Sequence, residues 1–190
     1  YDDILIGSPN EDSSGYLNNG AVYLYSGKDG SVLKRWEGVG SAVRLGGAVA
    51  NLGDVDGDGS TDVAFRYGIP VGVDRGRVVI RNLTTDVEIH HLGDPAGVRS
   101  FGTTITAAGD LNQDGHADIL IGAPDEAFGF NSEVGTVSAY SGADGSLLHF
   151  WKGNGGYCHF GETIAKVLDQ NGDGTDDIMI GGSGANFGTG

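Results

Sequence analysis

The sequence is short of cysteine and of basic residues, and each shortage excludes a class of protein. Cys158 is the single cysteine among 190 residues, so an intrachain disulfide framework is excluded. Lysine and arginine total 11 against 26 aspartate and glutamate residues, which gives a formal net charge of -15. A chain this acidic is a poor candidate for binding nucleic acid or an anionic membrane surface.

Long apolar runs and helical periods are missing as well. No run reaches the roughly 20 apolar residues of a membrane-spanning helix, so we expect no membrane insertion. No segment repeats its apolar residues at the spacing of an amphipathic helix. The Gly-x-Ser-x-Gly motif of serine hydrolases is absent. The five histidines fall in expected turns and strands, and none is accompanied by a pair of carboxylates at a position independent of the repeats. We therefore predict that this chain is not an enzyme.

Glycine, in contrast, is abundant, at 36 of 190 residues. This is more than twice its average share in proteins. The glycines stand at turn positions between short apolar runs that are rich in β-branched residues. This arrangement predicts many short strands and argues against disorder.

One acidic pattern occurs three times, at residues 54–62, 110–118 and 169–177, which we call the first, second and third acidic loops. Each reads Asp-x-Asp/Asn-x-Asp-Gly-x-x-Asp. Calcium takes about six to eight oxygen ligands, and this spacing offers side chains at positions one, three, five and nine and a carbonyl at position seven. The glycine at position six permits a sharp turn around an ion. Without a cation, the crowded acidic side chains would repel one another.

We therefore predict three Ca²⁺ sites, one in each complete acidic loop. The seventh residue of each loop would contribute its backbone carbonyl, and the other ligands would be side chains. The predicted ligands are Asp54, Asp56, Asp58, Ser60 and Asp62 in the first loop, Asp110, Asn112, Asp114, His116 and Asp118 in the second, and Asp169, Asn171, Asp173, Thr175 and Asp177 in the third.

The acidic loops differ at position twelve from EF-hand and dockerin-type calcium loops. Those loops carry an acidic ligand at this position and continue into a helix. Here position twelve is Phe65, Ile121 or Ile180, each inside a short apolar run typical of a buried strand. We therefore expect each acidic loop to join two strands, with the ninth-position aspartate at the start of the second strand.

The rest of the sequence repeats at the same step as the acidic loops. Residues 20–31 return as residues 135–146, and a weaker middle copy starts at Gly76. The best preserved unit contains four expected strands. They lie at residues 104–108, 119–121, 136–140 and 147–151.

Four antiparallel strands with apolar inner strands form a small sheet that needs cover on both faces. Radial stacking of four-stranded sheets provides that cover, as in a β-propeller. A β-sandwich is the alternative, but it would not explain a fixed step with a metal loop at one place in each unit. We predict an all-β chain of β-propeller blades, with about three and a quarter repeats.

The repeat divides the chain into two whole blades and two partial ones. The predicted boundaries are a partial blade at 1–44, blades at 45–100 and 101–159, and a partial blade at 160–190, with Asp3 matching the ninth position of an acidic loop. Propellers usually need about four to eight blades to close a ring. We expect the partners that close it to be the rest of a longer protein, which we favour, or self-associated copies of this chain.

Two short motifs flank the acidic loops. Phe-Gly opens units at residues 101–102 and 160–161, Leu-Gly takes its place at 45–46, and Gly-Ala-Pro follows a second strand at 122–124. Together with the acidic loop, these motifs resemble FG-GAP repeats, the units of the integrin alpha-subunit propeller. The resemblance covers essentially the whole chain. The Tyr-Ser-Gly-x-Asp-Gly-Ser turn is also similar to repeats of large secreted or surface bacterial proteins.

Some units depart from the Gly-Ala-Pro motif. It becomes Gly-Ser-Pro at residues 7–9, Gly-Ile-Pro at 68–70 and Gly-Gly-Ser at 181–183. The acidic-loop residues remain complete in the units that carry a whole loop. We interpret these departures as packing variations and not as lost metal sites.

The resemblance implies an extracellular module, secreted or on the cell surface, that serves in adhesion or ligand binding, with structural calcium loops. A protein or glycan ligand would bind on the face opposite the acidic loops. As an alternative to ligand contact, the aromatic rings on that face would cap blade edges. The face would include residues 10–19, 94–100, 125–133 and 153–159, with the aromatic candidates Tyr16, Phe128, Phe130 and Tyr157.

A second functional class remains open. Similar repeats accompany secreted lipid- and polysaccharide-cleaving enzymes, in which this chain would be a non-catalytic propeller domain or scaffold. A catalytic domain outside the repeats, found in a full-length sequence, would discriminate between the two.

Overall fold

The computed structural model describes residues 1–68, 76–93, 100–127 and 133–184. Within these ranges it contains thirteen β-strands and no helix, which confirms the prediction of an all-β chain. The strands are β1 (Ile4–Ser8), β2 (Ala21–Tyr25), β3 (Val32–Glu37), β4 (Val49–Gly53), β5 (Asp62–Tyr67), β6 (Arg77–Asn82), β7 (Glu88–Gly93), β8 (Thr104–Gly109), β9 (Asp118–Ala123), β10 (Thr136–Tyr140), β11 (Leu147–Lys152), β12 (Thr163–Val167) and β13 (Asp177–Gly181).

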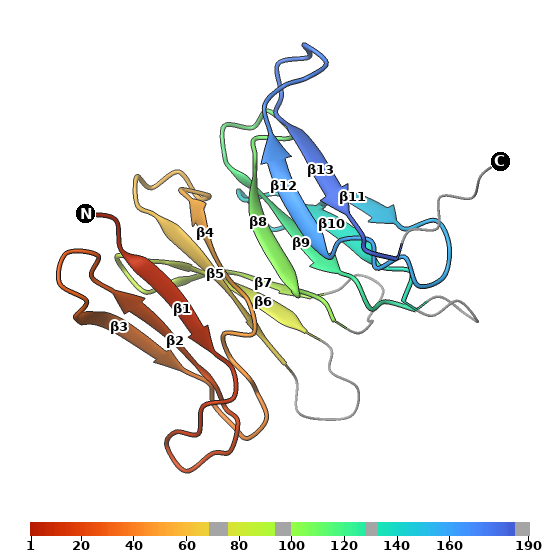
Figure 1. Cartoon of the computed structure of the whole chain (residues 1–190). Coiled ribbons are helices and arrows are strands. Elements are labelled where there is room, and N and C mark those ends of the chain that lie inside the picture. The colour runs from red at the N-terminus through yellow and green to blue at the C-terminus, as the bar shows by residue number, and fades with distance from the viewer. Residues whose placement is uncertain (69–75, 94–99, 128–132, 185–190) are drawn as a thin grey trace.

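The strands form four antiparallel sheets, and within each sheet every strand pairs with the next one along the chain. The first sheet holds β1–β3, the second β4–β7, the third β8–β11 and the fourth β12 and β13. The sheets follow one another from the red to the blue end of the chain (Figure 1). Repeated four-stranded meanders of this kind are FG-GAP-type propeller blades.

The first strands of the sheets lie side by side. β4 contacts β8, and β8 contacts β12, while β1 of the first sheet contacts β4 (Figure 1). The later strands of each whole sheet lie progressively farther from these contacts. The sheets are therefore arranged radially about their inner strands, as the repeat predicts.

Burial follows this arrangement. All residues of the middle strands β9 and β10 are buried, whereas the outer strand β11 alternates between exposed and half-buried residues. Strands that are covered on both faces need apolar residues on both faces. This requirement explains the continuous apolar run Ile119-Leu120-Ile121, whose members are at most 1% exposed.

The core consists of apolar clusters between neighbouring sheets. Val22 of the first sheet packs with Phe65 and Val79 of the second. Ile80 of the second sheet packs with Ile119 of the third. Burial of apolar surface contributes about 25 cal/mol of stabilising free energy per Å². Because each cluster joins two blades, this burial stabilises the contact between the blades as well as each sheet.

Candidate metal centre

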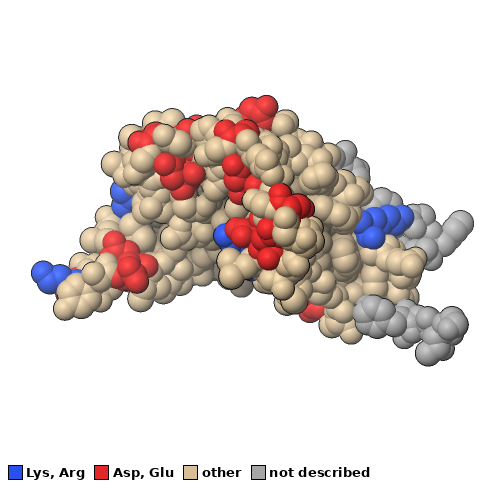
Figure 2. Space-filling model, turned by 90° about the horizontal axis from the view of Figure 1, so that it is seen from above, with Lys and Arg blue, Asp and Glu red and all other residues tan. Residues whose placement is uncertain are grey.

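The three acidic loops lie at the same end of their sheets. Each connects the first strand of a sheet to the second: β4 to β5, β8 to β9 and β12 to β13. Asp and Glu side chains gather on this face in the view from above (Figure 2). The glycine at position six has a φ of 85° in Gly59, 90° in Gly115 and 90° in Gly174. Only glycine adopts this backbone conformation readily, so the predicted sharp turn forms in all three loops.

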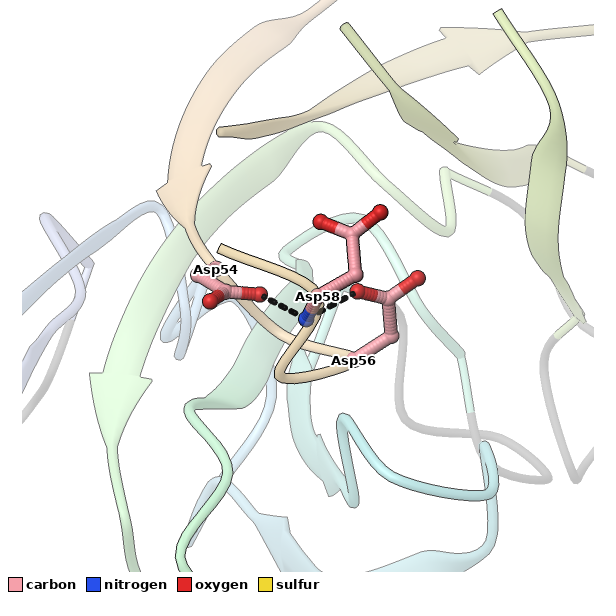
Figure 3. A group of neighbouring side chains, drawn as sticks. All are labelled: Asp54, Asp56 and Asp58. Atoms are coloured by element: carbon pink, nitrogen blue, oxygen red, sulfur yellow. Dashed lines mark hydrogen bonds between the residues drawn. The ribbon is translucent and has the colours of Figure 1, made fainter. Parts of the chain in front are cut away.

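In the first acidic loop, three carboxylates converge. One oxygen from each of Asp54, Asp56 and Asp58 lies within 4.8 Å of the others (Figure 3). Asp54 Oδ1 accepts hydrogen bonds from the backbone N–H groups of Gly57 at 2.8 Å and Asp58 at 3.1 Å. Asp54 Oδ2 accepts one from Gly59 at 2.9 Å. These bonds wrap the backbone around the first carboxylate and place the others beside it.

The ninth residue of this loop, Asp62, starts β5 and is 0% exposed. Its Oδ2 accepts a 2.8 Å hydrogen bond from Val55 N–H, but its buried Oδ1 has no hydrogen-bond partner among the described residues. Burial raises the pKa of the Asp62 carboxyl, and the charges of Asp56 and Asp54 raise it further. A buried, unpaired carboxylate oxygen is unfavourable without a positive partner. The donor set therefore fits a divalent cation.

The second acidic loop has the same backbone course with a different third residue. The side-chain N–H of Asn112 donates a 2.8 Å hydrogen bond to Asp114 Oδ2, and Asp110 Oδ2 accepts one from Gly115 N–H, also at 2.8 Å. The amide of Asn112, followed by the backbone N–H of His116, lowers the pKa of Asp114. An amide in place of a carboxylate thus relieves part of the repulsion in this loop.

Asp118, at the ninth position of the second loop, has a donor for each oxygen. Oδ2 accepts a 2.7 Å hydrogen bond from Leu111 N–H, and Oδ1 accepts a 3.1 Å one from Gly142 N–H. Burial raises the pKa of this carboxyl too, and the charge of Asp114 adds to the effect. The buried side chain of Asp118 is therefore better satisfied than that of Asp62.

The third loop repeats the pattern with more exposed side chains. Asp169 accepts hydrogen bonds from Gly174 N–H at 2.9 Å and Gly172 N–H at 2.6 Å, and these two bonds lower the pKa of its carboxyl. Asn171 donates to Asp173 at 2.9 Å, as its counterpart does in the second loop. Asp177 Oδ2 accepts a 2.6 Å bond from Gln170 N–H.

The seventh residue of each loop contacts the fifth. Its backbone N–H donates to the fifth-position carboxylate, at 2.7 Å for Ser60, 2.9 Å for His116 and 2.9 Å for Thr175. Within each loop, hydrogen bonds from backbone N–H groups to the carboxylates thus link the predicted ligand positions. The ligand roles themselves, including those of the three seventh-position carbonyls, stay predictions.

Two contacts to the acidic loops were not predicted from the sequence. Asn82 Nδ2 donates a 2.8 Å hydrogen bond to Asp58 Oδ2, and Ser141 Oγ lies 3.4 Å from Asp114 Oδ2. The two residues are equivalent by strand register: Asn82 is the last residue of β6, and Ser141 directly follows β10. The turn that follows the third strand recurs in the sequence, and this recurrence was the signal that could have pointed to a shared contact with the acidic loops.

The side chain of His116 forms a third contact that was not predicted from the sequence. Its Nδ1–H donates a 3.1 Å hydrogen bond to the carbonyl oxygen of Val55, in the first acidic loop. A Cβ at Gly57 would lie 2.9 Å from the His116 ring, so glycine is needed at this approach. The first and second acidic loops therefore touch across two sheets.

Comparison with known protein families matches one part of this sequence. The FG-GAP repeat family model matches residues 101–140, a stretch that holds β8, β9, β10 and the second acidic loop. The chain carries an FG-GAP repeat. In this repeat Phe101 is 1% exposed and packs edge-on against Tyr140, with ring centroids 6.2 Å apart. Phe101 also shares a core cluster with Val78 and Ile80 of the second sheet, so the phenylalanine of the Phe-Gly pair helps to join the second and third sheets.

The chain is also similar to integrin alpha subunits. It is 33% identical to human (Homo sapiens) integrin alpha-11 over 146 residues, which are 69% of this chain and 12% of that protein. Identity to Xenopus laevis integrin alpha-4 is 28% over 195 residues, covering 94% of this chain and 18% of that protein. The chain thus spans less than a fifth of these relatives, and it is identified here only as FG-GAP, integrin alpha-like propeller repeats.

The predicted ligand face is described in part. Tyr16 and Tyr157 are 41% and 62% exposed. Phe128 and Phe130 lie outside the described residues, as does most of the 94–100 segment. In the described ranges, no helix is long and apolar enough to span a membrane.

Proposed function

We propose that this chain is a calcium-binding, extracellular FG-GAP propeller module for adhesion or ligand binding, and that each acidic loop holds one structural Ca²⁺ ion. The observation that carries the proposal is the buried Oδ1 of Asp62, which has no hydrogen-bond partner among the described residues and belongs to a loop of converging carboxylates. A bound cation would supply the missing positive charge. The side chains of positions one, three, five and nine and the seventh carbonyl would hold it.

The ion would act on the fold and not on a substrate. Each acidic loop joins the inner strand of a sheet to its buried second strand, so holding the loop also fixes the entry of that strand. Asp62 and Asp118 are the first residues of β5 and β9 and are both 0% exposed. A cation that binds only the folded loop stabilises the folded chain by mass action.

The proposed extracellular location follows from the calcium affinity that is expected of such loops. Extracellular calcium modules bind with dissociation constants of about 10⁻⁴ to 10⁻³ M, which suits the millimolar calcium outside cells. Three or four predicted carboxylate ligands and an exposed rim at each acidic loop fit this weak class of site. The similarity to integrin alpha subunits supports the same extracellular setting.

Adhesion or ligand binding would use the face opposite the acidic loops. The 10–19 segment there is braced by Asn19, whose side chain donates a 2.8 Å hydrogen bond to Gly38 O and a 2.7 Å one to Ser13 Oγ. Exposed Tyr16 and Tyr157 support a role of this face in contact with a protein or glycan. We propose no catalytic role for the described residues.

Calorimetric titration tests the cation proposal. The chain is stripped with chelator, exchanged into chelator-free buffer and titrated with CaCl₂, with MgCl₂ as the control cation. We expect saturable uptake of three calcium ions per chain and weaker uptake of magnesium, which prefers octahedral sites with retained water. Heats no larger than dilution at millimolar calcium would refute the proposal.

A further inference from the structure

A hollow with a volume of about 650 Å³ lies between the first and second sheets. Its floor is apolar and buried, with Leu45, Phe65 and Val79 at 8%, 1% and 7% exposure. Its walls include the half-buried rings of Trp36, from β3, and Tyr67, from β5. A concave site of this volume, largely apolar with a few polar groups, is the usual form of a small-molecule site.

The equivalent place between the second and third sheets is filled by side chains. There Phe101 and Tyr140 pack edge-on, and the Tyr140 hydroxyl donates a 2.9 Å hydrogen bond to Gly93 O across the interface. By strand register, Leu45 occupies the place of Phe101, and Arg81 that of Tyr140. At the hollow, these two positions thus hold a smaller apolar side chain and a charged one in place of two aromatic rings.

Charged side chains of both signs line the rim of the hollow. Arg35 pairs with Glu37, and Arg81 Nη1 lies 3.8 Å from Glu88 Oε2. His91 Nδ1 lies 3.3 Å from Glu88 Oε1. The rim thus offers two guanidinium donors and two carboxylate acceptors, without the excess of one sign that a phosphate or a cationic ligand requires.

The aromatic wall is fixed in orientation. Trp36 Nε1–H donates a 2.6 Å hydrogen bond to Asp86 Oδ1, and its ring centroid lies 4.9 Å from that of Phe65. Arg81 Nε donates to the same Asp86 oxygen at 3.1 Å. Holding side chains in place before a ligand arrives lowers the entropy lost on binding.

We infer that the hollow between β3 and β5–β7 is a binding site for a neutral saccharide of about two sugar rings. Each sugar hydroxyl both donates and accepts, so it matches a rim of alternating carboxylates and guanidinium groups. The apolar C–H face of a sugar ring would pack on Trp36 or Tyr67, whose rings are apolar bodies with a polar tip. The inference deepens the proposed function and rests on it, because it names the ligand class of the binding module.

The test uses the whole chain in millimolar calcium. A printed array of neutral oligosaccharides ending in glucose, galactose, mannose or N-acetylglucosamine identifies a ligand, with sialylated and sulfated glycans as the comparison arm. Titration of the best neutral disaccharide or trisaccharide then follows intrinsic fluorescence. The chain has two tryptophans, so Trp151→Phe leaves Trp36 as the sole tryptophan reporter.

Leu45→Phe is the decisive variant, because it introduces the residue that fills the neighbouring interface. We expect saccharide affinity to fall at least tenfold while the melting temperature is unchanged or higher. Phe101→Leu is the matched control at the filled interface, and we expect it to lower the melting temperature and to keep saccharide binding. Trp36→Ala should also abolish binding, but it removes packing on Phe65 as well.

Three results would overturn the inference. They are the absence of any neutral saccharide binding by the wild-type chain, binding restricted to sialylated or sulfated glycans, and equal saccharide binding by Leu45→Phe. Calcium uptake is measured on the same samples. Normal uptake with any of these results refutes the saccharide site alone, whereas absent uptake refutes the cation proposal.

Discussion

The first and second acidic loops follow the same backbone course, but they satisfy their buried ninth-position carboxylates differently. Asp118 receives hydrogen bonds from Leu111 and Gly142, whereas Asp62 receives one, from Val55. In the second sheet the residue at the place of Gly142 is Leu83, and its N–H donates instead to Thr61 O at 2.9 Å. One oxygen of Asp62 therefore has no hydrogen-bond donor among the described residues.

The third position sharpens this difference. Asp56 adds a carboxylate to the first loop, where the second loop has Asn112, whose amide donates to Asp114. Like charges within 5 Å are unfavourable even near a protein surface. The comparison therefore predicts that the proposed cation stabilises the first loop more than the second, although both have the same sequence pattern.

Chelation should give the largest effect on the folded chain. At calcium concentrations of about 10 to 100 times the dissociation constant, each site adds roughly 1.4 to 2.7 kcal/mol to the free energy of unfolding. Three such sites should raise the melting temperature by roughly 10 °C or more in a chain of this length. Scanning calorimetry with and without chelator measures the shift. An unchanged melting temperature would contradict the structural role of calcium.

Replacing the ninth residue should change the melting temperature differently in the first and the second acidic loop. Asp62→Asn removes a buried, repelled charge and keeps one acceptor for Val55 N–H, so the melting temperature in chelator should hold or rise. In calcium the same variant should melt at a lower temperature than the wild type, because one charged ligand is lost.

Asp118→Asn is the matched change in the second loop. An asparagine there accepts at one oxygen only and leaves the N–H of Gly142 or Leu111 unpaired, which costs about 1 to 3 kcal/mol. We expect a lower melting temperature both with and without calcium, by roughly 2 to 12 °C. If both variants shifted in parallel in chelator, the contrast between the loops would be wrong.

The contact between the loops should have a smaller effect. His116→Ala removes the hydrogen bond to Val55 O, worth about 0.5 to 1.5 kcal/mol. Backbone amides of residues 54–62 should then exchange with deuterium faster, as measured by mass spectrometry of that peptide. Thr175→Ala is the control, because its hydroxyl bonds within its own loop, to Asp173. Equal exchange in His116→Ala and the wild type would show that the loops are independent.

The sequence predicted the fold well because local patterns specify it. Apolar runs such as residues 119–121 become buried strands, and position-six glycines become turns, through interactions within a few residues. The all-β class and the FG-GAP resemblance follow from this repetition, and both are confirmed.

Contacts between sheets were less predictable, because they depend on which side chains meet across an interface. The pattern assigned His116 a carbonyl role alone, yet its ring reaches Val55 in the neighbouring loop. Leu45 could be recognised as a substitute for phenylalanine, but the hollow beside it is also lined by Arg81, which lies on another strand. The missing donor at Asp62 likewise depends on the turn at Leu83, which is distant in the sequence.

A crystal structure of the chain grown in 10 mM CaCl₂ tests the central claim most directly. We expect an ion in each acidic loop, with ligand oxygens at about 2.3 to 2.6 Å. In the first loop, Asp62 Oδ1 should be one of those ligands. Three ordered loops that contain only water, with Asp62 Oδ1 paired to a protein donor, would contradict the account.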